Sequence, residues 1–151
     1  MSESNPIRVF VVHTFAEHPE YMRVFEYLES RPNFFYRNCS QPAARVAAGD
    51  GETLREELRR QIQLAEIVIF PVTLFALNPV LVTFEIDAAK GLQKPVLAIK
   101  SFGETIAIKK SLLDKAEDIV DWNNRSITEA IKRLARNDAS GQWEVIEFKL
   151  D

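Results

Sequence analysis

Cysteine, glycine-rich motifs and long apolar runs are scarce in this sequence, and each scarcity excludes a class of protein. Cys39 is the single cysteine and cannot form an internal disulfide, so a reducing cytoplasm is the expected compartment. The five glycines form neither a G-x-G-x-x-G fingerprint nor a Walker A loop, which argues against Rossmann and P-loop phosphate cradles. One cysteine and two histidines do not supply a zinc site with ligand spacing, so we expect no metal and no resident cofactor.

The charge balance and the hydropathy pattern exclude further partners. No apolar run approaches the ~20 residues of a membrane helix, and the N-terminus lacks the pattern of a secretory signal. A net charge of −3 argues against nucleic acid as the main partner. The 151 residues suit a single domain, residues 1–151, with a core at 7–136 and a C-terminal extension at 137–151.

Short β-rich apolar runs alternate with amphipathic segments along the chain. Runs such as "IRVFVV" and "EIVIFPV" predict buried strands, whereas apolar residues at helical spacing predict the intervening helices. Asn78 and Pro79 predict the start of a helix that Gly91 ends, and Asn124 or Ser126 is expected to cap the last helix. The alternation in "GQWEVIEFKL" predicts an additional edge strand near the C-terminus.

This pattern predicts an α/β fold in which helices cover both faces of a parallel sheet. Right-handed crossovers favour a flavodoxin-like three-layer sandwich with five strands in the order 2-1-3-4-5. In that arrangement a ligand binds beyond the carboxyl ends of the strands, where the order switches between the first and third strands.

Polar and aromatic residues follow the strands that meet at this edge. They are expected to form a small-molecule pocket with apolar walls and few polar groups. The candidates are His13, Thr14 and Phe15 after the first strand, Asn38 and Ser40 after the second, Phe75 after the third, and Asn78 at the next helix.

Two acids in "FEIDAAKG" have unequal surroundings. In a helix, Asp87 is expected to lie near Lys90, whereas the turn neighbours of Glu85 are apolar. Glu85 is therefore either a functional carboxylate beside the crevice or an acid that reaches the rim or pairs with a distant cation.

Other catalytic constellations lack their residues. There is no G-x-S-x-G nucleophile elbow, and no aspartate follows the first or third strand as in a phospho-acceptor pocket. His13 is more typical of a strand-end histidine bonded to backbone than of a base, and a lone buried Cys39 is usually inert. Arg55, Arg59 and Arg60 alternate with glutamates, which indicates a solvated helix face.

Five segments in order resemble the TIR-like domain family. "VFVVHTF" is similar to its first strand and loop, "FFYRNCS" to its second strand, and "VTFEIDAAKGLQKPVLAIKSFG" to its glutamate-bearing helix and fourth strand. "LREELRRQIQLAEIVIFPVTLFA" and "DIVDWNNRSITEAI" complete the resemblance, which covers residues 7 to about 134. The closest subgroup is the small TIR-like proteins of the bacterial Thoeris anti-phage system.

The resemblance implies NAD⁺ as substrate and Glu85 as the catalytic glutamate. It implies cleavage of the nicotinamide–ribose bond and a cyclic or modified ADP-ribose signal that activates a separate effector protein. Assembly into a homo-oligomer is left open. Two other functions also remain open: a non-catalytic TIR-like interaction module, and a nucleoside ribosyl- or deoxyribosyltransferase that uses the same single-carboxylate chemistry.

Overall fold

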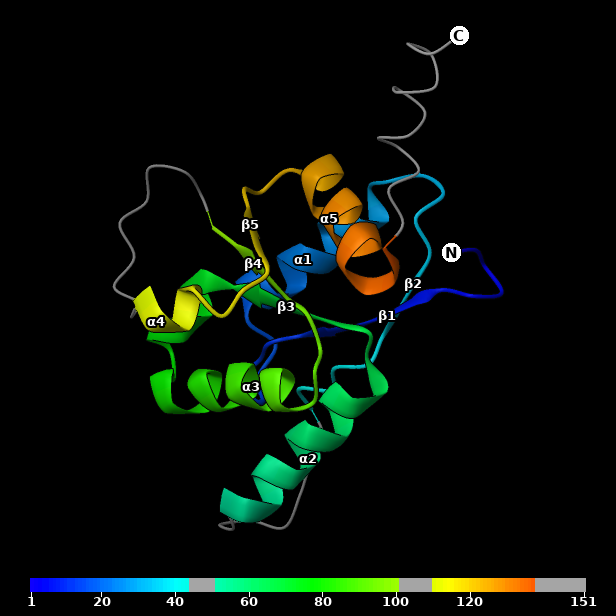
Figure 1. Ribbon diagram of the computed structural model, residues 1–151. Coiled ribbons are helices and arrows are strands. Elements are labelled where there is room, and N and C mark those ends of the chain that lie inside the picture. Colours follow the sequence, from blue (N-terminus) through cyan, green and yellow to red (C-terminus); the bar gives the residue numbers. More distant parts are fainter. Residues whose placement is uncertain (44–50, 101–109, 138–151) are drawn as a thin grey trace, which may run out of the picture.

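The computed structural model describes residues 1–43, 51–100 and 110–137 of the 151-residue chain. Within these ranges a central sheet lies between helices (Figure 1). The strands are β1 (Ile7–Val11), β2 (Tyr36–Asn38), β3 (Ile67–Pro71), β4 (Val96–Ile99) and β5 (Asp118–Val120). The helices are α1 (Pro19–Glu29), α2 (Gly51–Leu64), α3 (Pro79–Gly91), α4 (Lys110–Leu113) and α5 (Asn124–Arg136), with the 3-10 helix η1 (Val72–Ala76).

The described strands form a parallel sheet in the order β2-β1-β3-β4-β5. This confirms the predicted flavodoxin-like order. The order reverses between β1 and β3, so the segments that follow these two strands lie side by side at the carboxyl edge of the sheet.

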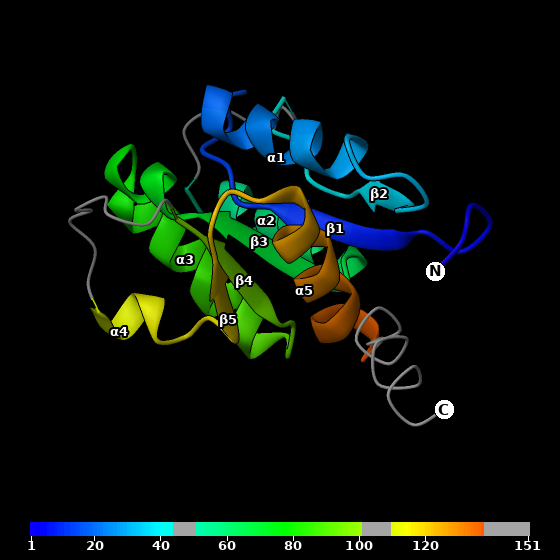
Figure 2. The same ribbon diagram turned by 90° about the horizontal axis from the view of Figure 1, so that it is seen from above.

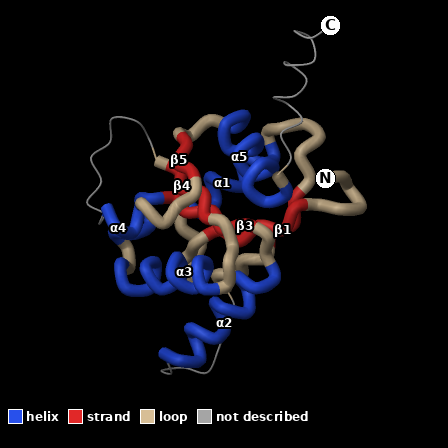
Figure 3. The backbone as a smooth tube through the Cα atoms, in the orientation of Figure 1, coloured by secondary structure: helices blue, strands red, loops and turns tan. Residues whose placement is uncertain are grey.

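Two pairs of helices cover the two faces of the sheet. Helices α1 and α5 pack on one face, and α2 and α3 pack on the other (Figures 1 and 2). Figure 3 shows the strands between these two layers of helices. All residues of β3 and β4 are buried, as expected for central parallel strands covered on both faces.

The strand residues alternate between two apolar cores. Val9, Val11 and Ile69 face α1 and α5, whereas Phe10 and Phe70 face α2 and α3. Because successive side chains of a strand point to opposite faces, one short strand serves both cores. Among the described helices, none is both long and apolar enough to span a lipid bilayer.

The helix boundaries correct one detail of the sequence prediction and confirm another. The N-cap of α5 is Asn123, neither Asn124 nor Ser126, because the extended Asn123 accepts the backbone N–H of Ser126 at 2.9 Å. Helix α3 ends at Gly91 as predicted, and a left-handed conformation follows at Gln93, with φ 60°. The predicted C-terminal edge strand and the extension beyond residue 137 lie outside the described residues.

Candidate functional site

Glu85 lies on the inward face of α3, directly against the end of β1. Asn78 caps this helix by accepting the N–H of Leu81 at 3.1 Å, and Pro79 takes the first helical position. About two turns of helix then place Glu85 beside the buried Val82 and Ile86. Its side chain is fully buried, and its Oε1 accepts the backbone N–H of His13 at 3.0 Å.

Among the described residues, no positive charge compensates the carboxyl group of Glu85. No ion pair to Glu85 exists within the ranges that the structure describes, and its Oε2 has no hydrogen-bond partner there. Burial therefore raises the pKa of Glu85 well above the ordinary value, while the bond from His13 acts in the opposite direction. Burial thus favours the neutral acid, and Oε2 is left without a described hydrogen-bond partner.

Asp87 lies at the surface, as the sequence predicted, but its ion-pair partner is not the predicted Lys90. Asp87 is exposed and pairs with Lys115, not with Lys90. Lys90 instead pairs with Glu117. Both partners follow α4 in the chain and reach α3 through tertiary packing, which helical spacing alone does not reveal.

His13 is buried as a neutral imidazole. Its Nδ1 accepts the N–H of Phe15 at 3.1 Å, and its Nε2 lies 2.9 Å from Oε1 of Gln61. Since a backbone N–H can only donate, Nε2 carries the proton and donates it to Gln61. Burial lowers the pKa of His13, which keeps the ring neutral. Both ring nitrogens are occupied, so His13 shapes the loop after β1, in agreement with the strand-end interpretation.

Gln61 is a site residue that the sequence did not identify. It lies on α2, is fully buried, and accepts N–H groups from both His13 and Gln41. Its Nε2 donates to the carbonyl of Gln41 at 3.3 Å. One amide thus joins the segments that follow β1 and β2. The sequence does contain a sign of this role, because Gln61 is a polar residue three positions after Leu58 and therefore falls on the apolar face of α2.

Asn38 and Ser40 form a second polar group at the end of β2, together with Tyr21 of α1. Tyr21 Oη lies 2.8 Å from Ser40 Oγ and accepts from Asn38 Nδ2 at 3.2 Å. Asn38 Oδ1 accepts both the N–H and the hydroxyl of Ser40. The Tyr21 ring lies edge-on to His13, with centroids 6.2 Å apart, so this group adjoins the Glu85 region.

Cys39 lies between these two polar residues and is buried. Burial raises the pKa of its thiol, which disfavours the reactive thiolate. This supports the interpretation of Cys39 as an inert core residue.

The two candidate aromatic residues and Thr14 line the same region. Phe15 has φ 59°, a left-handed conformation that is unusual for a bulky residue, and its ring lies edge-on to His13 with centroids 5.1 Å apart. Phe15 and Phe75 are partly buried against the core between the sheet and α2–α3. Thr14 is half-buried. Asn78 is exposed, and its side-chain oxygen is used in capping α3, so no described contact joins it to the other candidates.

Two further buried oxygen atoms lack partners among the described residues. They are Glu20 Oε2, in the first turn of α1, and Thr73 Oγ1, in η1. These segments follow β1 and β3, and they contact each other. Buried polar atoms without partners are costly in a folded protein, and three such oxygen atoms, with that of Glu85, lie near one edge of the sheet.

Metal binding has no visible basis in the described part of the chain. Across residues 1–43, 51–100 and 110–137, no three His, Cys, Asp or Glu side chains cluster closely enough to hold an ion. The chemistry that remains is that of one buried carboxyl group with hydroxyl, amide and aromatic neighbours.

Comparison with known proteins supports the fold. No protein-family model and no curated protein sequence matches the chain. A conserved protein from Enterococcus faecalis V583 is similar in structure, with a TM-score of 0.61 and 11% identity over 85% of this chain and 99% of the other. The DNA processing protein A of Helicobacter pylori, which binds single-stranded DNA, has a TM-score of 0.50 and 12% identity over 86% of this chain and 82% of the other. At these identities, the similarities show that the chain shares a parallel α/β fold with both proteins.

Proposed function

We propose that this protein cleaves NAD⁺ between nicotinamide and ribose, with Glu85 as the catalytic carboxylate. The observation that carries the proposal is the fully buried, unpaired carboxyl group of Glu85 at the carboxyl end of β1. The resemblance of the surrounding segments to TIR-like domains supports the same assignment. A buried carboxyl group without a described cationic partner is destabilising in a core, so a role in binding or catalysis gives a reason for its presence.

The reaction requires little beyond one carboxylate. The glycosidic bond to the nicotinamide nitrogen breaks, and its electron pair neutralises the departing pyridinium ring. The ribose carbon develops positive charge in an oxocarbenium-like transition state, which a carboxylate stabilises. Attack by water, with loss of its proton to solvent, gives ADP-ribose. Attack by a nucleophile of the same molecule gives a cyclic product, provided that water is excluded.

The buried state of Glu85 sets two conditions on this mechanism. The substrate can reach the carboxyl group only when the residues that bury it move, since Glu85 has no exposed surface. The positive charge of the nicotinamide ring then favours the ionised form of Glu85, which opposes the effect of burial on its pKa. Substrate binding and activation of the carboxylate are therefore coupled.

The biological role that we propose follows the TIR-like resemblance. A cyclic or modified ADP-ribose would act as a signal in anti-phage defence and would activate a separate effector protein. His13, Thr14, Phe15, Asn38, Ser40 and Phe75 are the proposed substrate contacts; the oxygen of Asn78 already caps α3, as described above.

The proposal is tested by incubating the purified protein with NAD⁺ and identifying the products by chromatography and mass spectrometry. Nicotinamide with ADP-ribose or a cyclic isomer is the expected result. Base exchange between deoxynucleosides with NAD⁺ left intact would instead support a deoxyribosyltransferase. No turnover at high protein concentration, together with a silent Glu85→Gln change in cells, would support an interaction module.

A further inference from the structure

A basic cavity lies at the opposite edge of the sheet, where the strands begin. Its volume is about 540 Å³. Three arginines and one glutamate supply its charges, and its lining is Ser4, Asn5, Pro6, Arg8, Arg37, Glu66 and Arg136. The proposed NAD⁺ chemistry uses none of these residues.

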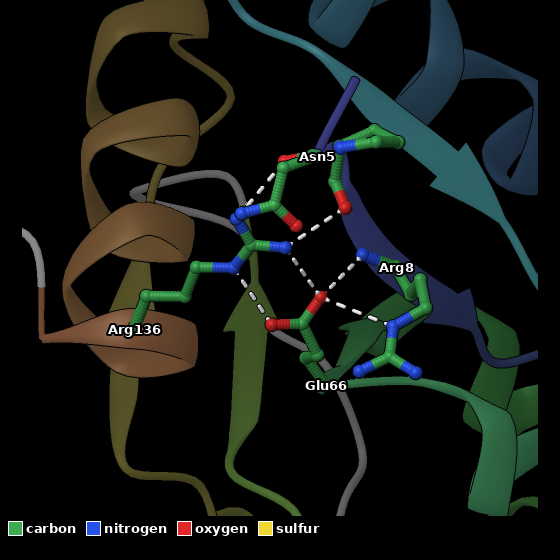
Figure 4. A network of polar contacts seen from close by, with 5 residues as sticks. Asn5, Arg8, Glu66 and Arg136 are labelled. Atoms are coloured by element: carbon green, nitrogen blue, oxygen red, sulfur yellow. Dashed lines mark hydrogen bonds and ion pairs between the residues drawn. The ribbon is translucent and has the colours of Figure 1, made fainter. Parts of the chain in front are cut away.

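The glutamate of this cavity is already saturated with donors. Glu66 Oε1 accepts from Arg136 Nε at 2.8 Å, and Oε2 accepts from Arg136 Nη2 and from the backbone N–H of Arg8, both at 2.9 Å (Figure 4). A fourth bond comes from Arg8 Nε at 3.3 Å. Hydrogen bonding from Arg136 is the main cause that lowers the pKa of Glu66 to about 2. Nη1 and Nη2 of Arg136 also donate to the carbonyls of Asn5 and Pro6, so Glu66 and these two carbonyls occupy most of the donors of Arg136.

Arg8 and Arg37 retain unused donors. They are paired residues of the adjacent strands β1 and β2, which places their side chains on the same side of the sheet. Within the described residues, the terminal nitrogens of Arg8 and the whole guanidinium of Arg37 make no hydrogen bond or ion pair. The charges of Arg8 and Arg37 also act on one common group, the thiol of Cys39. Burial raises the pKa of this thiol, and both positive charges oppose that rise.

Two neighbouring cations with free donors form a site for an anion. Each guanidinium presents a planar pair of N–H groups that matches two phosphate oxygens, and an anion between them removes their mutual repulsion. Glu66 holds the backbone and Nε of Arg8, so the free end of Arg8 is fixed before a ligand arrives.

The surroundings favour a small anion over a long nucleic acid. Arg37 also lines an adjoining cavity, whose other charged residues are Glu3, Glu29 and Arg31. Two carboxylates thus balance two guanidinium groups there, so this surface has no excess of positive charge to attract the further phosphates of a polynucleotide. We propose that the cavity binds the phosphate group of a small molecule through Arg8 and Arg37, with the Arg136–Glu66 pair as its support.

Titration calorimetry with sodium pyrophosphate at constant ionic strength tests this proposal. Wild-type protein should show saturable binding that inorganic phosphate competes away. Arg37→Gln should weaken binding at least 10-fold, because this change removes a charge and its free donors without breaking a described contact. Arg31→Gln is the matched control: Arg31 lines only the adjoining cavity, and this variant should bind within 2-fold of wild type.

Two further measurements locate the site. NAD⁺ itself contains a pyrophosphate, so binding at the cavity has to be distinguished from binding at the proposed NAD⁺ site. If pyrophosphate binds at the cavity, Glu85→Gln should leave its affinity unchanged. In NMR spectra of wild-type protein, pyrophosphate should shift the amide signals of Arg8 and Arg37 more than that of His13, a result that needs no variant. Absence of saturable binding, equal weakening in both arginine variants, or shifts centred on His13 would overturn the proposal. Tighter binding of a single-stranded oligonucleotide than of pyrophosphate would overturn the small-molecule assignment.

Discussion

Burial and function make opposite demands on the side chain of Glu85. The apolar core between the sheet and α2–α3 favours its neutral form, whereas the proposed reaction needs its negative charge. The sequence indicated the first half of this conflict, because the turn neighbours of Glu85 are apolar. It could not show the bond to the backbone of His13, which joins residues 72 positions apart.

The elevated pKa of Glu85 gives a pH dependence of stability with a defined sign. The folded state favours the neutral acid, so the contribution of Glu85 is fully present below the unfolded pKa, near 4.3, and is lost as pH rises through the folded pKa. Glu85→Gln keeps an acceptor for His13 but cannot ionise. We expect this variant to match wild type near pH 4 and to become increasingly more stable than wild type above pH 5.

Urea unfolding of both proteins across pH 4–9 measures this difference. Asp87→Asn, which changes an exposed acid on the same helix, is the control and should show no such growing gain. A gap between wild type and Glu85→Gln that stays constant with pH would contradict the burial argument.

Gln61 should matter more for stability than its residue type suggests. Gln61→Leu fills the same space but leaves the Nε2–H of His13 and the N–H of Gln41 without an acceptor. We expect a loss of about 3 kcal/mol in the free energy of unfolding, since each unpaired buried donor costs roughly 1–3 kcal/mol. Gln63→Leu changes an exposed residue of the same helix and should cost less than about 0.5 kcal/mol. Equal losses in the two variants would refute the role given to Gln61.

At the scale of elements, the sequence was most informative where local chemistry decides the structure. Apolar runs located the strands, and Asn78 with Pro79 located the start of α3. Strand order also followed, since right-handed crossovers leave few arrangements for this alternation. The start of α5 was less certain because Asn123, Asn124 and Ser126 are all capping residue types, and only the extended backbone of Asn123 selects among them.

The cap of α5 gives a test of this selection. Asn123→Ala removes the acceptor of the Ser126 N–H and should lower the free energy of unfolding by about 1 kcal/mol. Asn124→Ala removes only an exposed contact to Ser30 and should cost less than about 0.5 kcal/mol. Thermal or urea unfolding of both variants checks this order, and the reverse order would place the cap at Asn124.

At the scale of the whole molecule, Glu66 fastens three distant parts of the chain. Glu66 directly precedes β3, and it binds Arg8 of β1 and Arg136 at the end of α5 (Figure 4). No local pattern predicts this, because Arg136 lies 70 positions from Glu66. The proposed chemistry lies at the carboxyl ends of the strands, whereas the ion pairs of Glu66 with Arg8 and Arg136 lie at the opposite ends.

The lowered pKa of Glu66 predicts acid sensitivity. Its ionised form is favoured on folding, so its stabilisation is present above the unfolded pKa, near 4.3, and is lost as pH falls toward about 2. Glu66→Gln should lower the free energy of unfolding by about 2 kcal/mol at pH 7 and by progressively less below pH 4. Glu56→Gln, at an exposed position of α2, should leave it nearly unchanged. A Glu66→Gln deficit that persists undiminished at pH 2.5 would contradict the ionic role.

The rate of nicotinamide release from NAD⁺ by wild type and by Glu85→Gln, measured side by side, tests the central claim most directly. The urea unfolding measurements proposed for the same two proteins serve as the independent check that both are folded. We expect release by wild type and a fall of about 100-fold or more in the variant, the scale expected when a charge-stabilising group is removed. Release at an equal rate by both proteins, or by neither, would contradict the assignment of Glu85 as the catalytic carboxylate of an NAD⁺-cleaving enzyme.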